Sequence, residues 1–320
     1  MRDEVLEFLR QNQGDFVSGQ DMSEACHVSR TAIWKHIKAL RQKGYKIESY
    51  TKRGYRLLEE PDLLSPLAMK QILNTDIFGK RYVYMDTTES TNLEARRLAQ
   101  QGAEEGTVVV TEEQAAGRGR LSRGWYSPFG KGLWFSLILR PDFPPAEAPK
   151  CTLMAAVALT KAFHKMGLAD AGIKWPNDIL LSGRKLGGIL VEIINHKNGL
   201  LNLVVGIGIN AKLPQSTEIS QPYAQLTEQD PNIDRETILV KVIQRIYSRL
   251  AQFEEKGIDE EFMQQWINHN EFFGDEVNVF TEQGAISGIE QGIDKRGYLK
   301  VITSEGERYF NAGEVSLRRK

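Results

Sequence analysis

The chain has 320 residues, which at roughly 100–200 residues per domain predicts two or three domains rather than one. Hydrophobic residues make up 41% of the chain and charged residues 26%, which excludes a fibrous or a largely disordered protein. The formal net charge of −1 excludes a uniformly basic nucleic-acid coat, although charge can still be segregated within the chain.

Cysteine content and hydropathy indicate the compartment. The two cysteines, Cys26 and Cys151, are too few for a disulfide scaffold or a four-cysteine zinc site, which fits a reducing environment. The first residues are charged throughout, and the longest apolar stretch, Leu200–Ile209, is about half as long as a membrane span. We therefore expect a cytoplasmic protein with no signal peptide and no membrane partner.

The N-terminal part is expected to hold three helices. Apolar spacing predicts a first helix around Val5–Leu9 and a second over Ser18–Cys26. A third helix follows the N-cap residue Ser29 and ends at Gly44. Its apolar residues recur at helical spacing and form one buried stripe, made of Ile33, Ile37 and Leu40.

Basic charge is concentrated in the same part of the chain. Nine basic residues and one acidic residue, Glu48, lie within 28–57. Residues 45–47 and 55–57 alternate like strands around a turn that contains Gly54, which predicts a basic hairpin after the third helix. Three helices followed by a hairpin are typical of the winged helix-turn-helix.

This order predicts DNA binding. The third helix would enter the major groove with Arg30 and Thr31 at base edges, while lysines and Arg53 would neutralise phosphates. The expected DNA-binding residues are Ser29, Arg30, Thr31, Lys35, Lys38, Lys52 and Arg53. The alternative is a protein-binding module with a solvated basic face. The salt dependence of binding distinguishes the two hypotheses, because counterion release makes DNA affinity fall steeply with ionic strength.

A proline and a change of charge sign at Glu59–Asp62 mark the first domain boundary. We expect a DNA-binding domain over 1–60, a central domain over 65–270 and a C-terminal domain over 271–320. The elements expected in the central domain are a helix opening at Ser65-Pro66, a strand at 82–84, a helix over 90–101, strands at 107–111 and 133–139, a helix over about 146–166, and strands at 173–175, 185–194 and 201–209. Short connections between the last strands predict hairpins, and so a mixed, largely antiparallel α+β domain.

One glycine motif matches a dinucleotide-binding site by its letters. Gly206–Ala211 reads G-x-G-x-x-A, but Lys212-Leu213-Pro214 follows where a Rossmann site needs a helix. The sequence contains no P-loop, HExxH or GxSxG motif. The five histidines are scattered, so we expect surface or core residues rather than metal ligands.

A second glycine-rich segment, Gln114–Trp125, is predicted to be a loop between strands. Its arginines alternate with glycines, and such loops suit oxyanions because exposed N–H groups and guanidinium forks both bind them. The alternative is a mobile surface turn with solvated arginines. Two further motifs are Lys174–Asp178 and Arg184–Glu192, in which paired glycines follow Lys185 and permit either close approach of a ligand or a bulge.

Five motifs in this order resemble those of biotin protein ligases, and the preceding helix-turn-helix resembles the bifunctional family that also represses the biotin operon. They are Ser90-Thr91-Asn92, Gly117-Arg118-Gly119-Arg120, Lys174-Trp175-Pro176-Asn177-Asp178, Lys185-Leu186-Gly187-Gly188 and Gly206-Ile207-Gly208-Ile209-Asn210. The resemblance covers essentially the whole chain. It implies a class II synthetase-like central domain and a C-terminal SH3-like β-barrel, and the latter fits the short alternating strands expected at 277–280, 285–289, 299–302 and 308–310.

The resemblance also implies an activity. Such ligases use ATP, with Mg²⁺, to convert biotin to biotinyl-5′-AMP, and then transfer biotin to a lysine of a biotin carboxyl carrier domain. The protein loaded with biotinyl-5′-AMP would act as a repressor, with the adenylate as its corepressor. It would form a homodimer on an operator with two half-sites. The expected partners are therefore carrier domains of biotin-dependent carboxylases, operator DNA and a second copy of the chain.

By the same resemblance, motif residues take roles in the reaction. The implied catalytic residues are Lys185, Arg118 and Arg120. The implied biotin-binding residues are Ser90, Thr91, Asn92, Gln114, Arg118, Gly119, Arg120 and Lys185, and the implied adenylate-binding residues are Arg123, Trp125, Lys174, Asn177 and Asn210. These cations suit the chemistry. Two anions about 4 Å apart repel by roughly 4 kcal/mol at a surface-like dielectric, which would slow the reaction about a thousandfold. Fixed cations offset this repulsion.

Two other classes of protein remain open at this point. A transcription factor that senses a small molecule would explain the N-terminal part and a pocket, but it would not need three converging cations. A lipoate ligase or another acyl-adenylating ligase would share the chemistry with a different acid. Exchange of labelled pyrophosphate into ATP with biotin, with lipoate or with neither acid distinguishes the three.

Overall fold

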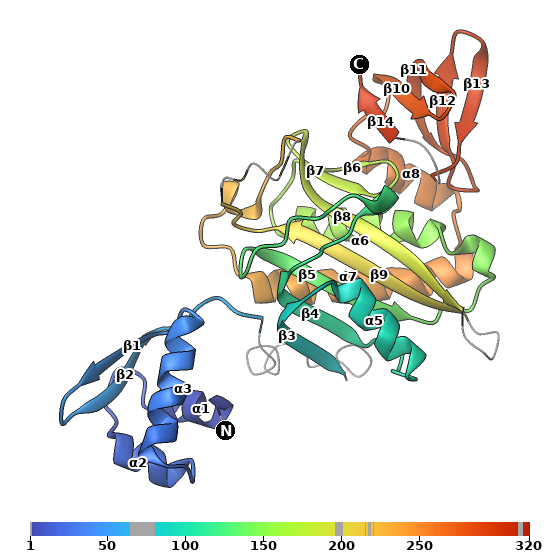
Figure 1. Ribbon diagram of the computed structural model, residues 1–320. Coiled ribbons are helices and arrows are strands. Elements are labelled where there is room, and N and C mark those ends of the chain that lie inside the picture. Colours follow the sequence, from blue (N-terminus) through green and yellow to red (C-terminus); the bar gives the residue numbers. More distant parts are fainter. Residues whose placement is uncertain are drawn as a thin grey trace. The chain divides into compact units, whose positions relative to one another are not determined.

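The computed structural model describes residues 2–64, 81–195, 201–214, 216, 219, 221–312 and 316–320 (Figure 1). The chain forms two compact units, Met1–Asp62 and Leu63–Lys320. The helix expected to open at Ser65-Pro66 and the turn expected after Asn195 lie outside the described residues. In the part that is described, no helix is both long and apolar enough to cross a membrane.

The first unit is a winged helix-turn-helix, as the sequence predicts. Its elements are α1 (Arg2–Gln11), α2 (Gly19–Ala25), α3 (Arg30–Gln42), β1 (Lys46–Tyr50) and β2 (Gly54–Glu59). Ser29 caps α3 through its side-chain oxygen, which accepts a hydrogen bond from the Ala32 amide at 3.2 Å. The stripe made of Ile33, Ile37 and Leu40 is buried, so the opposite face of α3 lies in water.

The hairpin of β1 and β2 is held against the segment before α2. Backbone hydrogen bonds of 2.9 Å run in both directions between Val17 and Tyr55. Gly54 adopts a φ of +98°, and a Cβ there would lie 1.9 Å from the Val17 carbonyl oxygen. The wing is therefore fixed at its base, and glycine is required at this turn.

The second unit is built on a seven-stranded sheet of order β3-β4-β5-β9-β8-β7-β6 (Figure 1). The strands are β3 (Tyr82–Thr88), β4 (Val108–Gln114), β5 (Gly132–Leu139), β6 (Ala171–Lys174), β7 (Asp178–Leu181), β8 (Arg184–Asn195) and β9 (Leu201–Asn210). β3 pairs with β4 in parallel and the other neighbours pair antiparallel, which confirms a mixed, largely antiparallel α+β sheet. The short strand β7 was not anticipated.

Helices cover the sheet on both faces. The helices are α5 (Thr91–Gln100), α6 (Lys150–Lys165), α7 (Arg235–Lys256) and α8 (Glu260–His269). Along β4, Val108 and Val110 join the core formed with α6 and α7, whereas Val109 joins a separate cluster under α5. Because successive strand residues point to opposite faces, α5 lies on the other face from α6 and α7.

Two helices that the sequence analysis did not anticipate complete the main core. Local signals for both are present, since the Asp234 side chain caps α7 and the Asp259 side chain caps α8. Ile238, Val242 and Ile246 recur at helical spacing on the buried face of α7. The helix expected from about residue 146 begins later, at Lys150, after a 3₁₀ turn over Pro145–Glu147.

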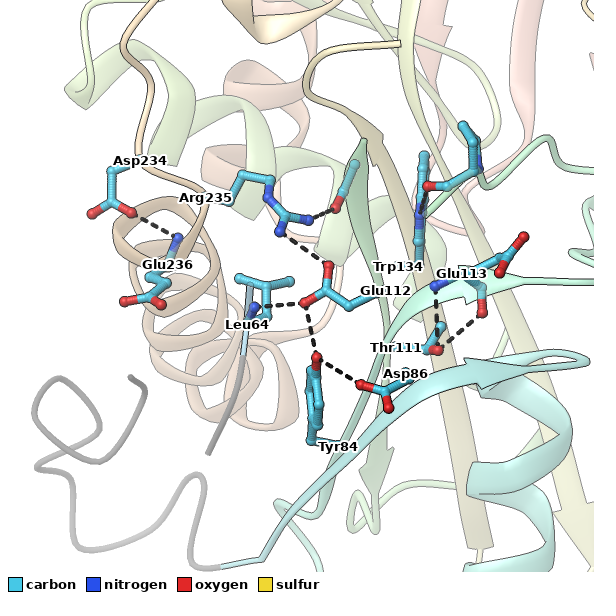
Figure 2. Close-up of polar contacts among 12 residues, drawn as sticks. Leu64, Tyr84, Asp86, Thr111, Glu112, Glu113, Trp134, Asp234, Arg235 and Glu236 are labelled. Carbon is cyan, nitrogen blue, oxygen red and sulfur yellow. Dashed lines mark hydrogen bonds and ion pairs between the residues drawn. The ribbon is translucent and has the colours of Figure 1, made fainter. Parts of the chain in front are cut away.

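A buried ion pair joins α7 to β4. Arg235 Nη2 lies 3.0 Å from Glu112 Oε2, with the two side chains 2% and 0% exposed. The Leu64 amide donates to Glu112 Oε1 at 2.6 Å, and the Tyr84 hydroxyl lies 3.4 Å from the same oxygen. Figure 2 shows Glu112 between Arg235, Leu64 and Tyr84. This carboxylate thus connects the first residues of the second unit to the strand that ends at Gln114.

The C-terminal part forms a five-stranded antiparallel sheet of order β13-β12-β11-β10-β14. Its strands are β10 (Glu276–Thr281), β11 (Gly284–Ile293), β12 (Leu299–Thr303), β13 (Gly306–Phe310) and β14 (Ser316–Arg319). Four of them overlap the expected strands, and β14 was not anticipated. Closure of this sheet into an SH3-like barrel stays a prediction.

The C-terminal sheet contains a fully buried carboxyl group, that of Glu290 on β11. Its oxygens accept hydrogen bonds from Asn270 Nδ2 at 2.8 Å and from the Gly292 amide at 2.9 Å. Burial, which these two donors only partly offset, raises the pKa of Glu290 to about 7. The ionised form is therefore disfavoured in the folded protein.

Replacing Glu290 with Gln is expected to change the pH dependence of stability. In the folded protein the pKa of Glu290 lies above its usual value of 4.5. The protonated side chain therefore adds to the free energy of unfolding below pH 4.5, and this contribution is lost as the pH rises from 4.5 through about 7. The loss amounts to about 3 kcal/mol. The Tm of Glu290→Gln minus that of the parent protein should therefore rise between pH 5 and pH 8. A constant difference would contradict the assigned pKa.

Candidate functional site

A cavity of about 1320 Å³ opens on the α5 face of the sheet. Val204 on β9 packs under α5, and because side chains alternate along a strand, Gly206, Gly208 and Asn210 point to the same face. The cavity is lined by all the residues expected at the ligase site, Ser90, Thr91, Asn92, Gln114, Arg118, Gly119, Arg120, Arg123, Trp125, Lys174, Asn177, Lys185 and Asn210. The structure thus brings these residues together, while their individual roles stay predictions.

The glycines of β9 provide room at the floor of the cavity. A Cβ on Gly206 would lie 1.9 Å from Asn92 Oδ1, and a Cβ on Gly208 would lie 2.4 Å from Trp125 Nε1. Both glycines lie within β9, and residues 211–214, which follow it directly, form a bend and not a helix. This segment is therefore not a dinucleotide-binding turn, as the sequence analysis expected, and its glycines permit close approach of side chains to the strand.

Polar side chains converge at one end of the cavity. The Thr91 amide donates to Gln114 Oε1 at 2.9 Å, and Gln114 Nε2 donates to Ser127 Oγ at 2.8 Å. Ser136 Oγ lies 2.8 Å from Thr91 Oγ1 and 2.7 Å from Asn92 Oδ1. Ser127 and Ser136 were missed in the sequence, because each acts through a partner on another strand or helix. The network fixes the donors and acceptors at this end.

Ser90 differs from the other polar residues at this end. It occupies the N-cap position of α5, yet its side chain makes no capping hydrogen bond. The side chain is only 2% exposed and lines the cavity. Its hydroxyl therefore faces the cavity without being engaged by the helix end.

Glu192 on β8 organises the neighbouring part of the site. Its Oε2 accepts a hydrogen bond from Asn92 Nδ2 at 2.7 Å, and its Oε1 lies 3.1 Å from Arg118 Nη2 and 3.2 Å from Arg96 Nη2. The carboxylate holds the Arg118 guanidinium at the edge of the cavity. Glu192 lies 74 residues from Arg118 in the chain, so sequence spacing alone gave no sign of this pairing.

Lys185 lies at the other end of the cavity with a carboxylate partner. Its Nζ is 2.8 Å from Asp178 Oδ1, and the two side chains are 18% and 16% exposed. The same Nζ lies 5.1 Å from the centroid of the Trp125 ring. The ammonium group is thus held between a carboxylate and an aromatic ring, with its position largely fixed.

The paired glycines after Lys185 lie next to a bulge and close to another side chain of the cavity. The pairing of β7 with β8 shifts between Ile179 and Leu180, which leaves Leu186 as a bulge. A Cβ on Gly188 would lie 3.2 Å from the Trp125 ring, so this glycine also permits close approach.

The loop between β4 and β5 carries Arg120 into the cavity. A short 3₁₀ turn, Arg120–Ser122, follows Gly119, and Leu121 and Ser122 within it adopt φ values of +55° and +56°. Non-glycine residues in this region are strained, and such strain is common at ligand-binding sites. The Trp125 amide donates to the Gly117 carbonyl at 2.8 Å, which closes the loop on itself.

Arg120 also reaches the C-terminal part of the chain. Its Nη1 donates to Asn177 Oδ1 at 3.2 Å, and its Nη2 donates to the carbonyl of Ala312. Burial lowers the pKa of Arg120. Leu317 and Arg318 line the same cavity. The C-terminal sheet therefore contributes to the lining of the cavity.

The remaining residues expected on the adenylate side have distinct surroundings. Burial lowers the pKa of Lys174, with the nearby cationic Lys185 acting in the same direction. Asn210 Nδ2 donates to the carbonyls of Lys185 and Ala224 at 3.2 and 3.0 Å, so it braces the backbone that carries Lys185. Arg123 is exposed at the cavity rim.

The residues expected to bind DNA lie on the first unit. Ser29, Arg30, Thr31, Lys35, Lys38, Lys52 and Arg53 are all exposed. The Arg53 and Arg56 guanidinium carbons lie 4.9 and 4.6 Å from the centroid of the Phe16 ring. Phe16, which the sequence analysis did not single out, thus holds the basic side chains of the wing by cation–π contact.

Metal ligands are not clustered anywhere in the part of the chain that the structure describes. No group of three or more His, Cys, Asp or Glu side chains there is placed to hold a metal ion. Asp178 and Glu113 are acidic residues that line the cavity. A divalent cation that enters on a nucleotide needs only one or two protein carboxylates, because phosphates and water supply the other ligands.

The fold and the cavity together define a protein ligase that carries a helix-turn-helix unit. Three family models match in chain order. They are an HTH domain over residues 2–56, the biotin/lipoate A/B protein ligase family over 83–210, and the biotin protein ligase C-terminal domain over 272–318.

Relatives match over nearly the full length. The bifunctional ligase/repressor BirA of Bacillus subtilis is 35% identical, covering 99% of this chain and 98% of the relative. BirA of Escherichia coli is 33% identical, covering 95% and 94%. The structure of biotin protein ligase from Aquifex aeolicus in complex with biotin and ATP matches with a TM-score of 0.66 and 32% identity, covering 75% of this chain and 100% of that one. The chain belongs to the bifunctional ligase/repressor family.

Proposed function

We propose that this chain activates biotin with ATP to form biotinyl-5′-AMP and transfers biotin to a lysine of a carrier protein. We further propose that it represses transcription with biotinyl-5′-AMP as corepressor. The observation that carries the ligase function is the convergence of Lys185, Arg118 and Arg120 with the polar network of Thr91 and Gln114 in one cavity. Membership of the ligase/repressor family supports both activities.

The cations act on the crowded negative charge of adenylation. The biotin carboxylate must approach the α-phosphate, form the mixed anhydride and release pyrophosphate. Lys185 is held in place by Asp178, and we assign it to the carboxylate and the bridging phosphate. Arg118 and Arg120 are assigned to the neighbouring oxygens of the biotin carboxylate and the α-phosphate. Fixed donors there stabilise the charge that develops in the transition state.

The polar end of the cavity is assigned to the ureido ring of biotin. Ser90, Thr91, Asn92 and Gln114 supply hydroxyl and amide groups there, and Ser136 orients two of them. The Ser90 hydroxyl makes no capping bond, which leaves it available for the ligand. Gly119 is assigned to close approach of the loop backbone to the ligand. A site built from such donors and acceptors discriminates strongly against an acid that cannot pair with them.

The adenylate is assigned to the other end. Arg123, Trp125, Lys174 and Asn177 line this part of the cavity, and Asn210 positions the backbone that carries Lys185. Trp125 provides a ring that covers the ligand, and the loop that carries it excludes water from a hydrolysable anhydride. Mg²⁺ is proposed to enter on the phosphates of ATP, where it neutralises charge.

Pyrophosphate exchange tests the ligase function. The purified protein should incorporate labelled pyrophosphate into ATP when biotin is present, because adenylation is reversible before transfer. Lipoate in place of biotin should give no exchange above the level without acid. Exchange with lipoate alone would identify a lipoate ligase, and absence of exchange with either acid would favour a ligand-sensing transcription factor.

Replacing Gly206 with Ala is expected to weaken biotin binding. The new Cβ would lie 1.9 Å from Asn92 Oδ1, so Asn92 must move and its hydrogen bonds with Ser136 and Glu192 must change. We expect the KM for biotin to rise at least tenfold, since a loss of about 1.4 kcal/mol is tenfold in affinity. Gly19→Ala is the matched control, because Gly19 does not line the cavity and a Cβ there makes only ordinary contacts of 3.7 Å or more. Equal effects of the two changes would contradict the assigned role of Asn92.

Repression is proposed to depend on dimerisation. Paired half-sites on an operator require a symmetric dimer of helix-turn-helix units, and we propose that biotinyl-5′-AMP promotes it. Sedimentation with biotin and ATP should show a homodimer, and the affinity for operator DNA should rise under the same conditions. The affinity should also fall steeply between 50 and 200 mM salt, as phosphate contacts require. Operator affinity that is indifferent to biotin and ATP would contradict the coupling.

A further inference from the structure

Trp34 is a large apolar side chain left in water on α3. Its indole is 53% exposed, whereas Trp134, Trp175 and Trp266 are at most 1% exposed. Ile33, Ile37 and Leu40 already fill the buried side of α3, so Trp34 has no place in the core of this unit. Single exposed apolar side chains are common on protein surfaces, so a binding role for Trp34 has to follow from the residues that surround it.

The position of Trp34 on α3 places it beside the expected base readers. It follows Arg30 by four residues and Thr31 by three, and side chains at these spacings lie on the same face of a helix. Both neighbours are exposed. Trp34 therefore extends by one turn the face that begins at the capped N-terminus of α3.

The surroundings of Trp34 are cationic. Lys38 Nζ lies 5.5 Å from the centroid of the Trp34 ring, and Lys35 is exposed next to it. Cations around an exposed ring suit a polyanion with apolar features between its charges, which describes the major groove of duplex DNA. An apolar protein surface would not require these lysines.

We propose that Trp34 reads a thymine in each operator half-site through apolar contact with the C5-methyl group. The methyl group of thymine is the apolar feature that a major groove presents, and polar side chains such as Arg30 read the other base edges. Burying one such group is worth about 0.8 kcal/mol, which is about fourfold in affinity. The inference rests on the proposed DNA-binding function and adds a specificity-determining residue to it.

Removing single methyl groups from the DNA tests the proposal. Duplexes are first selected from a random library with the full chain, biotin and ATP, and each thymine of the selected half-site is then replaced by uracil. Replacing the contacted thymine in one half-site should weaken binding by the parent protein about fourfold, and replacing it in both half-sites should weaken binding about fifteenfold. In Trp34→Ala the same replacement should have no effect, and Trp34→Phe should restore part of the difference.

The salt slope of binding serves as the control for folding. Trp34→Ala should keep the slope of the parent protein, because the phosphate contacts of Lys35, Lys38 and the wing remain. Equal effects of the uracil replacements on parent and Trp34→Ala would overturn the proposal, as would a parent protein that is insensitive to every replacement. A parent protein without salt-dependent DNA binding would instead refute the DNA-binding function itself.

Discussion

Lys185→Met lowers the rate of biotin-dependent pyrophosphate exchange by about a thousandfold. The carboxylate and the phosphate repel by roughly 4 kcal/mol at about 4 Å, and this barrier is no longer offset when the ammonium group is removed. Methionine keeps the length and the apolar stem of the side chain, so the change acts on charge. Arg120→Ala should also lower exchange by orders of magnitude, because it removes a second cation from the same cavity.

Two controls make the Lys185 result specific. Lys212→Met removes the same charge from an exposed residue after β9 and should leave exchange unchanged. Lys185→Met also leaves Asp178 without its partner at 2.8 Å, which adds repulsion. Adding Asp178→Asn should therefore recover only part of the rate. Full recovery would mean that Lys185 serves merely to neutralise Asp178, and near-normal exchange by Lys185→Met itself would refute the assigned role.

Glu112→Gln lowers the free energy of unfolding of the second unit by about 3–5 kcal/mol, the usual cost of removing one partner of a buried ion pair. Glutamine has nearly the same shape, but Arg235 then remains charged and buried without its carboxylate. One hydrogen bond from the Leu64 amide is also weakened. Urea unfolding that is followed by the fluorescence of the buried tryptophans measures this change.

Removing both members of the pair should cost less than removing one. Glu112→Gln with Arg235→Met leaves no uncompensated charge, so part of the lost stability should return. Glu94→Gln disrupts the exposed pair with Arg97 and should change unfolding little, because solvent screens surface ion pairs. A loss for Glu112→Gln as small as for Glu94→Gln would show that the buried pair contributes little.

Elements encoded by local chemistry could be predicted from the sequence. The Ser29 cap and the apolar stripe of α3 identify this helix without any distant contact, and a glycine turn identifies the wing. The hairpins of β8 and β9 follow in the same way from length and alternation. α7 was missed although Asp234 and its apolar spacing mark it, so this omission lay in the interpretation and not in the sequence.

Contacts between distant residues could not be predicted in this way. The types and the order of the motifs predicted that the cavity residues share one site. The partners that hold these residues in place come from elsewhere in the chain. Glu192 lies 100 residues from Asn92, and Ala312 lies 192 residues from Arg120. Asp178 was visible in its motif, but its pairing with Lys185 joins two strands, β7 and β8, whose register includes the bulge at Leu186.

The place of Trp125 has a consequence for how ligands enter. Its indole lies so close to β9 that even a methyl group on Gly208 would collide with it, at 2.4 Å. An acyl-nucleotide therefore cannot slide between ring and strand until the indole swings aside. Measured affinities will include the free energy of that rearrangement. At saturating ligand, stopped-flow tryptophan fluorescence should reach a concentration-independent rate, set by movement of the loop that carries Trp125.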